Sequence, residues 1–362
     1  MIERTDVQRV HEAAAAHARA LDAALVLYAG ANVGSYPSMG PPGAKLQPGL
    51  EHLEVVEVLT ARAVAAAMRA EHAEIRPQSA TLANLAVYAA LTPVGSTLAA
   101  LPPWAGGHAS HYATAGVRGH RVVELPYDPE RHDVDLEALP AFLERERPAL
   151  VVLGGSLALF PHRLREIAAA GVPVLYDASH TAGLIAGGRF QDPLADGATA
   201  VTFSTYKSFA GPAGGAIVTR RADVAEAVSR AVYPALTANY DAARLPALHA
   251  AATELQRDGR AYADACIAAA QALSAALADA GFALVGAGRG PTESHHVAIV
   301  HDAPDAVARL AGAGIYLSAT LAPSSDGPVR ALRMGTQQLV RQGLTAGDMP
   351  AIAERIAAVL RG

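Results

Sequence analysis

Lysine is rare in this sequence, because 27 of its 29 basic residues are arginines and only Lys45 and Lys207 are lysines. Lys207 lies between an apolar run rich in β-branched residues, ATAVTFST, and a glycine-rich turn, SFAGPAGG. Arginine carries a permanent charge, whereas a lysine whose pKa is lowered by burial can act as a neutral amine nucleophile. We therefore expect Lys207 to be a nucleophile in an active site. For Lys45 a surface position without function is an equally good interpretation.

Other groups with acid–base or hydrogen-bonding chemistry lie where predicted strands end. The segment VPVLYDAS is predicted to be a strand that ends in Asp177, and His180 follows three residues later. The segment ATAVTFST ends with Ser204, and Tyr206 and Lys207 follow it. Because ligands collect at the carboxyl ends of parallel strands, we expect the acid and the amine to meet at one edge of a sheet.

This combination suits pyridoxal phosphate. A lysine forms the Schiff base with the cofactor, and a carboxylate keeps the pyridine nitrogen protonated so that the ring accepts electrons released from Cα. Ser79, Ala80 and Thr81 begin a predicted helix, whose free backbone N–H groups and hydroxyls would bind the phosphate. His108 follows the pair Gly106-Gly107 and could lie flat against the ring. Each residue alone also has a structural interpretation, such as a helix cap or a buried histidine, so the prediction depends on their combination.

The elements that must position these residues follow from hydrophobic periodicity. Helices are expected at about 53–73 and 79–91, followed by strands that alternate with helical or turn-rich segments. This alternation predicts an α/β fold with a mostly parallel sheet covered by helices on both faces. A helix at about 246–280, the strand HHVAIV and two further helices predict a smaller α+β domain. We divide the chain into an N-terminal arm (1–50), a cofactor-binding large domain (51–240) and a small domain (241–362).

Composition excludes several classes of protein. A chain of 362 residues with 51% hydrophobic and 17% charged residues is globular rather than disordered. The net charge of −5 and the absence of a Lys/Arg cluster argue against a nucleic-acid partner. A single cysteine, Cys266, excludes an internal disulfide and suits the cytoplasm. The absence of a long apolar run argues against a membrane. No metal site is expected.

Six motifs resemble the serine hydroxymethyltransferase family, whose members have the aspartate-aminotransferase-like fold (PLP fold type I). They are GLEHLEVVE, RPQSATLANLAVY, GGHASHYATAG, YDASHTAGLIAGG and TYKSFAGPAGG, between about Glu51 and Gly215, and ALRMGTQQLVRQG at 331–343. The resemblance covers most of the chain and implies a homodimer with its sites at the interface.

The resemblance implies a role for each candidate residue. Lys207 would carry the cofactor as a Schiff base, and Asp177 would contact the pyridine nitrogen. Arg333, in the last motif, would bind the α-carboxylate of the substrate, a task that suits its planar fork. The other implied cofactor contacts are His180 near the phenolic oxygen, His108 on the ring, Ser79, Ala80 and Thr81 at the phosphate, and Ser204.

The sequence departs from the family at residues that handle folate chemistry. Counting back from GLEHLE, Met39 occupies the place of a proton-handling glutamate, and Gln47 that of a tyrosine contributed by the partner subunit. Neither can replace the lost group, because methionine does not titrate and an amide is not a phenol. Tyr206 replaces the histidine before the lysine, and Ala213 replaces an arginine.

These departures predict an aldolase- or transaldolase-like enzyme that forms or cleaves the Cα–Cβ bond of a small β-hydroxy amino acid without tetrahydrofolate, with an aldehyde as product or co-substrate. Either His108 or a water held by Tyr206 would be the base, and the sequence leaves this open. Folate-dependent hydroxymethyl transfer is one alternative, and a transaminase, racemase or decarboxylase is another. A protein that binds the cofactor without turnover is the third.

Overall fold

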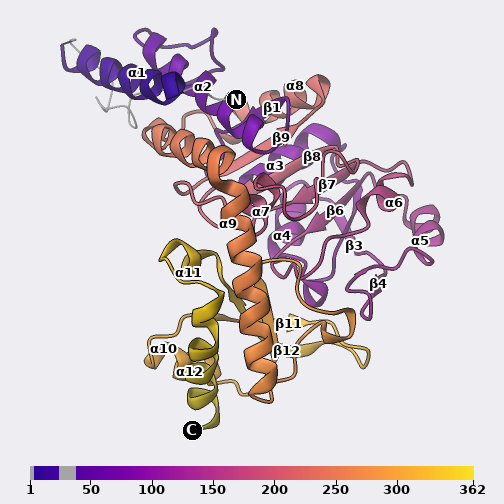
Figure 1. The fold of residues 1–362 in the computed structure, drawn as a ribbon. Coiled ribbons are helices and arrows are strands. Elements are labelled where there is room, and N and C mark those ends of the chain that lie inside the picture. Colours follow the sequence, from indigo (N-terminus) through magenta and orange to yellow (C-terminus); the bar gives the residue numbers. More distant parts are fainter. Residues whose placement is uncertain (1–3, 24–37) are drawn as a thin grey trace.

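The computed structural model describes residues 4–23 and 38–362, which form an N-terminal helix, a large α/β domain and a small C-terminal domain (Figure 1). Helix α1 (Arg4–Asp22) packs against α2 (Glu51–Ala67) and α9 (Leu245–Asp279). The long helix α9 runs along both domains (Figure 1). The division of the chain at residues 50 and 240 stays a prediction.

A seven-stranded sheet forms the centre of the large domain. Its five neighbouring strands from β3 to β8 are parallel, and β9 runs antiparallel to β8 and β1. The predicted mostly parallel sheet is therefore confirmed. In spatial order the strands are β1 (His72–Glu74), β9 (Gly215–Thr219), β8 (Ala200–Ser204), β7 (Val174–Asp177), β6 (Leu150–Gly154), β2 (Thr97–Ala100) and β3 (Arg121–Glu124).

Helices cover both faces of this sheet, since successive strand residues point to opposite sides. Val151 and Leu153 of β6 join the hydrophobic core under α2 and α7, whereas Leu150 and Val152 join the core under α3 and α8. This explains why the strands are almost uninterrupted apolar runs. The large-domain helices other than α2 are α3 (Ala80–Leu91), α4 (Ala109–Val117), α5 (Leu139–Glu146), α6 (Leu164–Ala168), α7 (Ala182–Ala186) and α8 (Ala222–Arg230).

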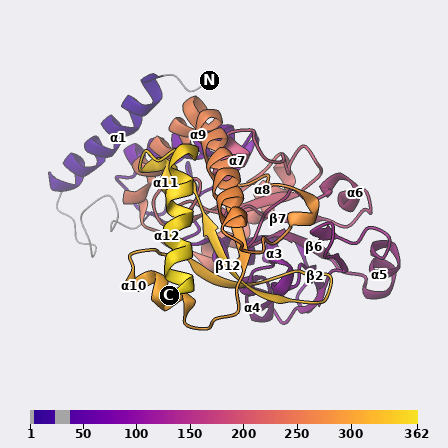
Figure 2. The same cartoon turned by 60° about the horizontal axis from the view of Figure 1, so that its bottom comes forward.

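The small domain is a three-stranded antiparallel sheet with helices on one face. Its strands pair in the order β10 (His296–Val300), β12 (Val329–Gly335) and β11 (Ser318–Ala322). Helices α9 and α12 (Met349–Arg361) lie side by side over this sheet (Figure 2). Two short helices complete it, α10 (Ala306–Gly312) and α11 (Gln337–Arg341).

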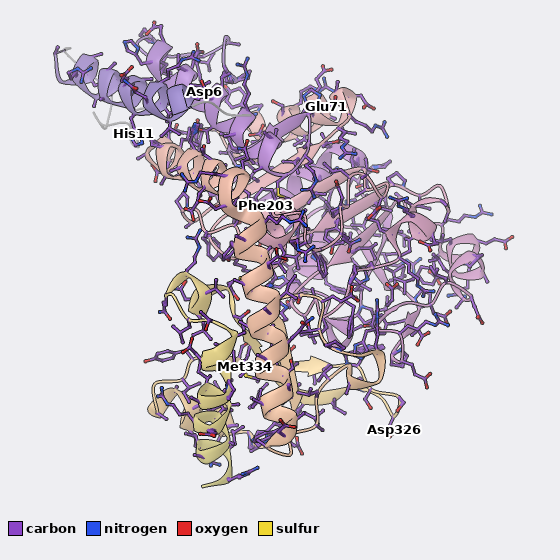
Figure 3. The ribbon with its side chains drawn as sticks, in the orientation of Figure 1. Asp6, His11, Glu71, Phe203, Asp326 and Met334 are labelled. Atoms are coloured by element: carbon purple, nitrogen blue, oxygen red, sulfur yellow. The ribbon has the colours of Figure 1, made fainter. Side chains whose placement is uncertain are left out.

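Helix α9 belongs to the cores of both domains. Leu248 and Leu255 in its first half join the core that contains Phe203, and Leu273 in its second half joins the core that contains Met334 (Figure 3). By length and composition alone, the segment Ala242–Asp279 is apolar enough to cross a membrane. Its apolar residues are instead used in these two cores, and the absence of a membrane partner stays a prediction.

Lys45 is not a surface residue. Its Nζ lies 2.7 Å from Glu57 Oε1, and the two side chains are only 4% and 5% exposed. Lys45 Nζ also donates to Ser38 Oγ at 3.0 Å and to the Gly40 carbonyl at 2.9 Å, while the Tyr240 hydroxyl donates to the same Glu57 oxygen. This buried ion pair joins the segment 38–45 to α2 and to the chain before α9.

We expect Lys45→Met to lower the free energy of unfolding by about 3–5 kcal/mol, because it leaves the Glu57 carboxylate buried without a cation. Urea denaturation would measure this. The matched control is Arg230→Met, which breaks the exposed pair with Glu226 and should cost less than about 1 kcal/mol. Equal losses in the two variants would show that the Lys45 pair is not a buried constraint.

Candidate active site

One cavity brings together nine of the ten residues that the sequence predicts for the site. It holds about 440 Å³ including its opening to solvent, at the carboxyl ends of β6, β7 and β8 and the start of α3. Two larger hollows of about 1020 and 750 Å³ lie along α2 and contain none of these residues. The predicted residues in the cavity lining are Ser79, Ala80, Thr81, His108, Asp177, His180, Ser204, Tyr206 and Lys207.

Lys207 is half-buried in this lining, and its Nζ lies 3.1 Å from His180 Nε2. Burial lowers the pKa of Lys207, Asp177 opposes this effect and Arg333 adds to it. The net decrease favours the neutral amine that a nucleophile requires. Tyr206, directly before it, is 53% exposed at the cavity.

The glycine-rich turn after Lys207 closes against the start of α3. Backbone hydrogen bonds from Thr205 to Gly214 and from Gly211 to Thr205 hold the turn together. A Cβ on Gly215 would lie 2.2 Å from the Ser79 carbonyl oxygen, so this close approach requires glycine. The contact between Gly215 and Ser79 therefore positions the turn after Lys207 against the predicted phosphate site.

Asp177 is a buried carboxylate at the end of β7. Its Oδ2 accepts hydrogen bonds from Asn84 Nδ2 and from His111 Nε2, each at 2.9 Å, and its Oδ1 accepts one from the Ser179 backbone N–H at 2.9 Å. Burial acts to raise the pKa of Asp177, but these hydrogen bonds outweigh it and hold the pKa well below its usual range. Asp177 is therefore anionic at neutral pH.

The residues that support Asp177 were not identified from the sequence. His111 is the second histidine of the motif GGHASHYATAG, and Asn84 is a fully buried amide in the mostly apolar helix α3. Thr202 of β8 donates its hydroxyl hydrogen to Asn84 Oδ1 at 2.6 Å and so fixes the amide. A polar residue on the apolar face of a helix was the available signal.

The start of α3 offers an anion site. Ser79 is the N-cap of the helix predicted to begin here, and its Oγ accepts a hydrogen bond from the Leu82 N–H at 3.2 Å. The backbone N–H groups of Ala80 and Thr81 belong to the first turn, where a phosphate is favoured. Across the cavity, the His108 ring is oriented by Ser110, whose N–H donates to Nδ1 at 3.1 Å. Burial lowers the pKa of His108, which keeps the ring neutral.

Arg333 is the one predicted site residue outside the cavity lining. It lies on β12 of the small domain, and its Nη1 donates to the Ser156 carbonyl, next to Gly155 in the lining. Within residues 4–23 and 38–362 Arg333 has no acidic partner. Burial lowers the pKa of its guanidinium. Its charge also lowers the pKa of Lys207 and His180. An unpaired, partly buried guanidinium beside the amine is suited to bind a carboxylate.

Two further histidines lie near Arg333 and were not identified from the sequence. The ring of His296 lies 5.1 Å from that of His180 and 4.2 Å from that of His295, between centroids. Burial lowers the pKa of His295 to about 3. Nitrogen atoms of the three rings lie within 4.8 Å of one another, a donor set that suits a metal ion. The nearby Arg333 cation opposes a metal there, and the expectation of no metal site stays a prediction.

The described residues thus fit pyridoxal phosphate, since an amine, an ionised carboxylate and an anion-binding helix start surround one cavity. The family model for serine hydroxymethyltransferase matches residues 10–356. The chain belongs to the serine hydroxymethyltransferase family. The fold, the cofactor pyridoxal phosphate and an enzyme of the PLP-dependent lyase and transferase class, all predicted from the sequence, are therefore confirmed.

The proteins similar to this chain include aldolases and hydroxymethyltransferases. An alpha-methylserine aldolase from Variovorax paradoxus is 41% identical over 343 residues, which cover 91% of this chain and 78% of the relative. A serine hydroxymethyltransferase from Pyrobaculum neutrophilum is 39% identical over 336 residues, covering 89% and 78%. The crystal structure of L-threonine transaldolase from Pseudomonas fluorescens in the internal aldimine state matches with a TM-score of 0.83 and 27% identity, covering 90% and 77%.

We expect His111→Phe to weaken binding of pyridoxal phosphate by about 10- to 100-fold, because a hydrogen bond to a charged group contributes about 1.5–3 kcal/mol. A fluorescence titration of the apoenzyme would measure the Kd. His120→Phe is the matched control, since His120 is also buried but contacts Thr92 outside the cavity. An unchanged Kd in His111→Phe would contradict the role of Asp177 as the pyridine contact.

Acidification should destabilise the protein through His295. Its pKa falls from 6.5 to about 3 on folding, so between these values the unfolded chain binds a proton that the folded chain does not. Its stabilising contribution is therefore complete above about pH 6.5 and decreases by about 1.4 kcal/mol per pH unit below it. Urea denaturation at pH 7 and pH 5 should show a smaller decrease for His295→Phe than for the wild type or for His52→Phe, which removes an exposed imidazole. Equal decreases would contradict this assignment.

Proposed function

We propose that this enzyme cleaves and forms the Cα–Cβ bond of a small β-hydroxy α-amino acid by aldol chemistry, without tetrahydrofolate. One observation carries the proposal: Lys207, Asp177 and an unpaired Arg333 surround one site, whereas Met39 and Gln47 stand where the family has its folate-linked residues. Neither Met39 nor Gln47 lines the cavity of its own chain. The relatives named alpha-methylserine aldolase and L-threonine transaldolase support the same reaction class.

Bound pyridoxal phosphate supplies an electron sink for the carbon from which a bond is broken. Asp177, which stays ionised, would hold the proton on the pyridine nitrogen. Lys207 would supply the amine that holds the cofactor and yields to the amino group of the substrate. Arg333 would bind the α-carboxylate by two parallel hydrogen bonds and so set which bond to Cα is exposed to cleavage.

The β-hydroxyl proton must leave when the Cα–Cβ bond breaks and an aldehyde forms. His108 is one acceptor, because its ring is neutral and lies in the cavity lining. A water at the exposed Tyr206 hydroxyl is the other. In the reverse direction the same group would return the proton to the aldehyde oxygen as the bond forms.

We also propose that the enzyme is a homodimer in the cytoplasm. Leu46 and Val55 are exposed apolar side chains, and the two hollows along α2 lie around Pro42 and Val58. A second copy of the chain would cover this apolar surface. Cys266, the one cysteine, is buried and unpaired, which suits a reducing compartment.

Aldehyde release from α-methylserine, threonine and phenylserine tests the reaction. We expect release without tetrahydrofolate and no increase when tetrahydrofolate is added. Lys207→Arg should reduce turnover at least about 1,000-fold, because arginine cannot act as a neutral amine. Lys45→Arg is the matched control, since it keeps the cation at the other lysine and should keep turnover.

Other outcomes identify other reactions. Serine cleavage that requires tetrahydrofolate would show folate-dependent hydroxymethyl transfer. A keto acid, a change of configuration at Cα, or carbon dioxide would identify a transaminase, a racemase or a decarboxylase.

A further inference from the structure

His296 and Arg333 project from the same face of the small-domain sheet. In the β10–β12 pair His296 lies opposite Gly335, and Arg333 is two residues before that glycine on β12. Residues two apart on a strand share a face. The other face carries Val297 and Met334, which belong to the small-domain core. The face with His296 and Arg333 therefore looks toward the large domain.

One large-domain loop orients both side chains. The Ala158 N–H donates to His296 Nδ1 at 3.2 Å, and Arg333 Nη1 donates to the Ser156 carbonyl. Ser294 strengthens the link, since its hydroxyl donates to the Ala158 carbonyl and accepts from the His296 N–H at 3.0 Å. This loop follows Gly155, which lines the Lys207 cavity. The same loop thus holds His296 and Arg333. The His296 ring lines a neighbouring hollow beside Phe160 and lies 5.1 Å from the ring of His180, which lines the Lys207 cavity.

These contacts determine where His296 carries its proton. The side chain is 2% exposed, and burial lowers its pKa well below the usual value, so the ring is neutral. Because Nδ1 accepts a hydrogen bond, the proton lies on Nε2. Among the described residues Nε2 has no hydrogen-bond acceptor, and it is not among the fully buried polar atoms that lack a partner. An N–H that is accessible and has no protein acceptor can donate to the oxygen of a bound ligand.

We propose that His296 is a specificity-determining residue that donates a hydrogen bond from Nε2 to the α-carboxylate of the substrate, beside Arg333. A carboxylate has about four lone-pair sites, and the guanidinium fork uses only two of them. A neutral donor satisfies a third without adding a second positive charge. The pair also disfavours amines that lack a carboxylate, because both donors would then remain unsatisfied. This inference rests on the proposed function only in requiring an amino-acid substrate.

Glycine binding tests the inference without any bond cleavage. Glycine is titrated into the holoenzyme and followed by the absorbance change of the cofactor, and propylamine is the matching amine without a carboxylate. His296→Phe should raise the Kd of glycine about 10- to 100-fold, the loss expected for one hydrogen bond to a charged group. The Kd of propylamine should not change. His249→Phe, at a buried histidine of α9 that does not line the Lys207 cavity, is the control and should bind both ligands like the wild type.

Two results would overturn the inference: an unchanged Kd of glycine in His296→Phe, or an equal loss for glycine and propylamine, which would show that His296 acts on the cofactor. If His296→Phe does not fold, His296→Gln and His296→Asn decide. The glutamine amide reaches the position of Nε2, whereas the shorter asparagine amide does not. The His296→Gln enzyme should therefore bind glycine more tightly than the His296→Asn enzyme, and equal Kd values would refute the hydrogen bond. A wild-type enzyme that binds glycine but cleaves no β-hydroxy amino acid would refute the proposed function and leave this comparison valid.

Discussion

A negative charge inside the protein is the constraint on which the site depends. The Asp177 carboxylate is buried, and hydrogen bonds from three described residues, Asn84, His111 and Ser179, help to keep it ionised. Each donor needs its own support, as the bond from Thr202 to Asn84 shows. The ends of β7 and β8 and the faces of α3 and α4 are therefore placed around one carboxylate. A cofactor ring that must hold a proton on its nitrogen can use such a group.

The same sheet edge brings positive charge and small residues to the other side of the cavity. Gly154, with φ of +78°, ends β6 where a Cβ would lie 2.1 Å from the Asp177 carbonyl oxygen. Gly215 permits the equivalent approach to Ser79. These two close contacts bring the end of β6 against Asp177 of β7 and the start of β9 against the start of α3. Arg333 then approaches from the small domain, which α9 joins to the large domain through two hydrophobic cores.

The two lysines illustrate how surroundings decide the role of a side chain. Lys207 has an imidazole beside its amine and no carboxylate in contact, so burial favours its neutral form. The Lys45 side chain is only 4% exposed, and its Nζ lies 2.7 Å from Glu57, so this buried ion pair is a structural link. The sequence around Lys207 already indicated a nucleophile, but only the neighbours in space showed that Lys45 forms a buried ion pair.

The sequence by itself determined the parallel strands, the helix that begins near Ser79 and nine residues of one cavity, because these depend on local periodicity and on the rule that strand ends carry the site. It did not reveal β1, β9 or β12, nor the support of Asp177 by His111 and Asn84, which lie 66 and 93 positions away along the chain. The tandem His295-His296 likewise gained meaning only when the small domain placed it beside Arg333. Contacts between distant segments depend on how the layers pack, and no local pattern in the chain encodes that arrangement.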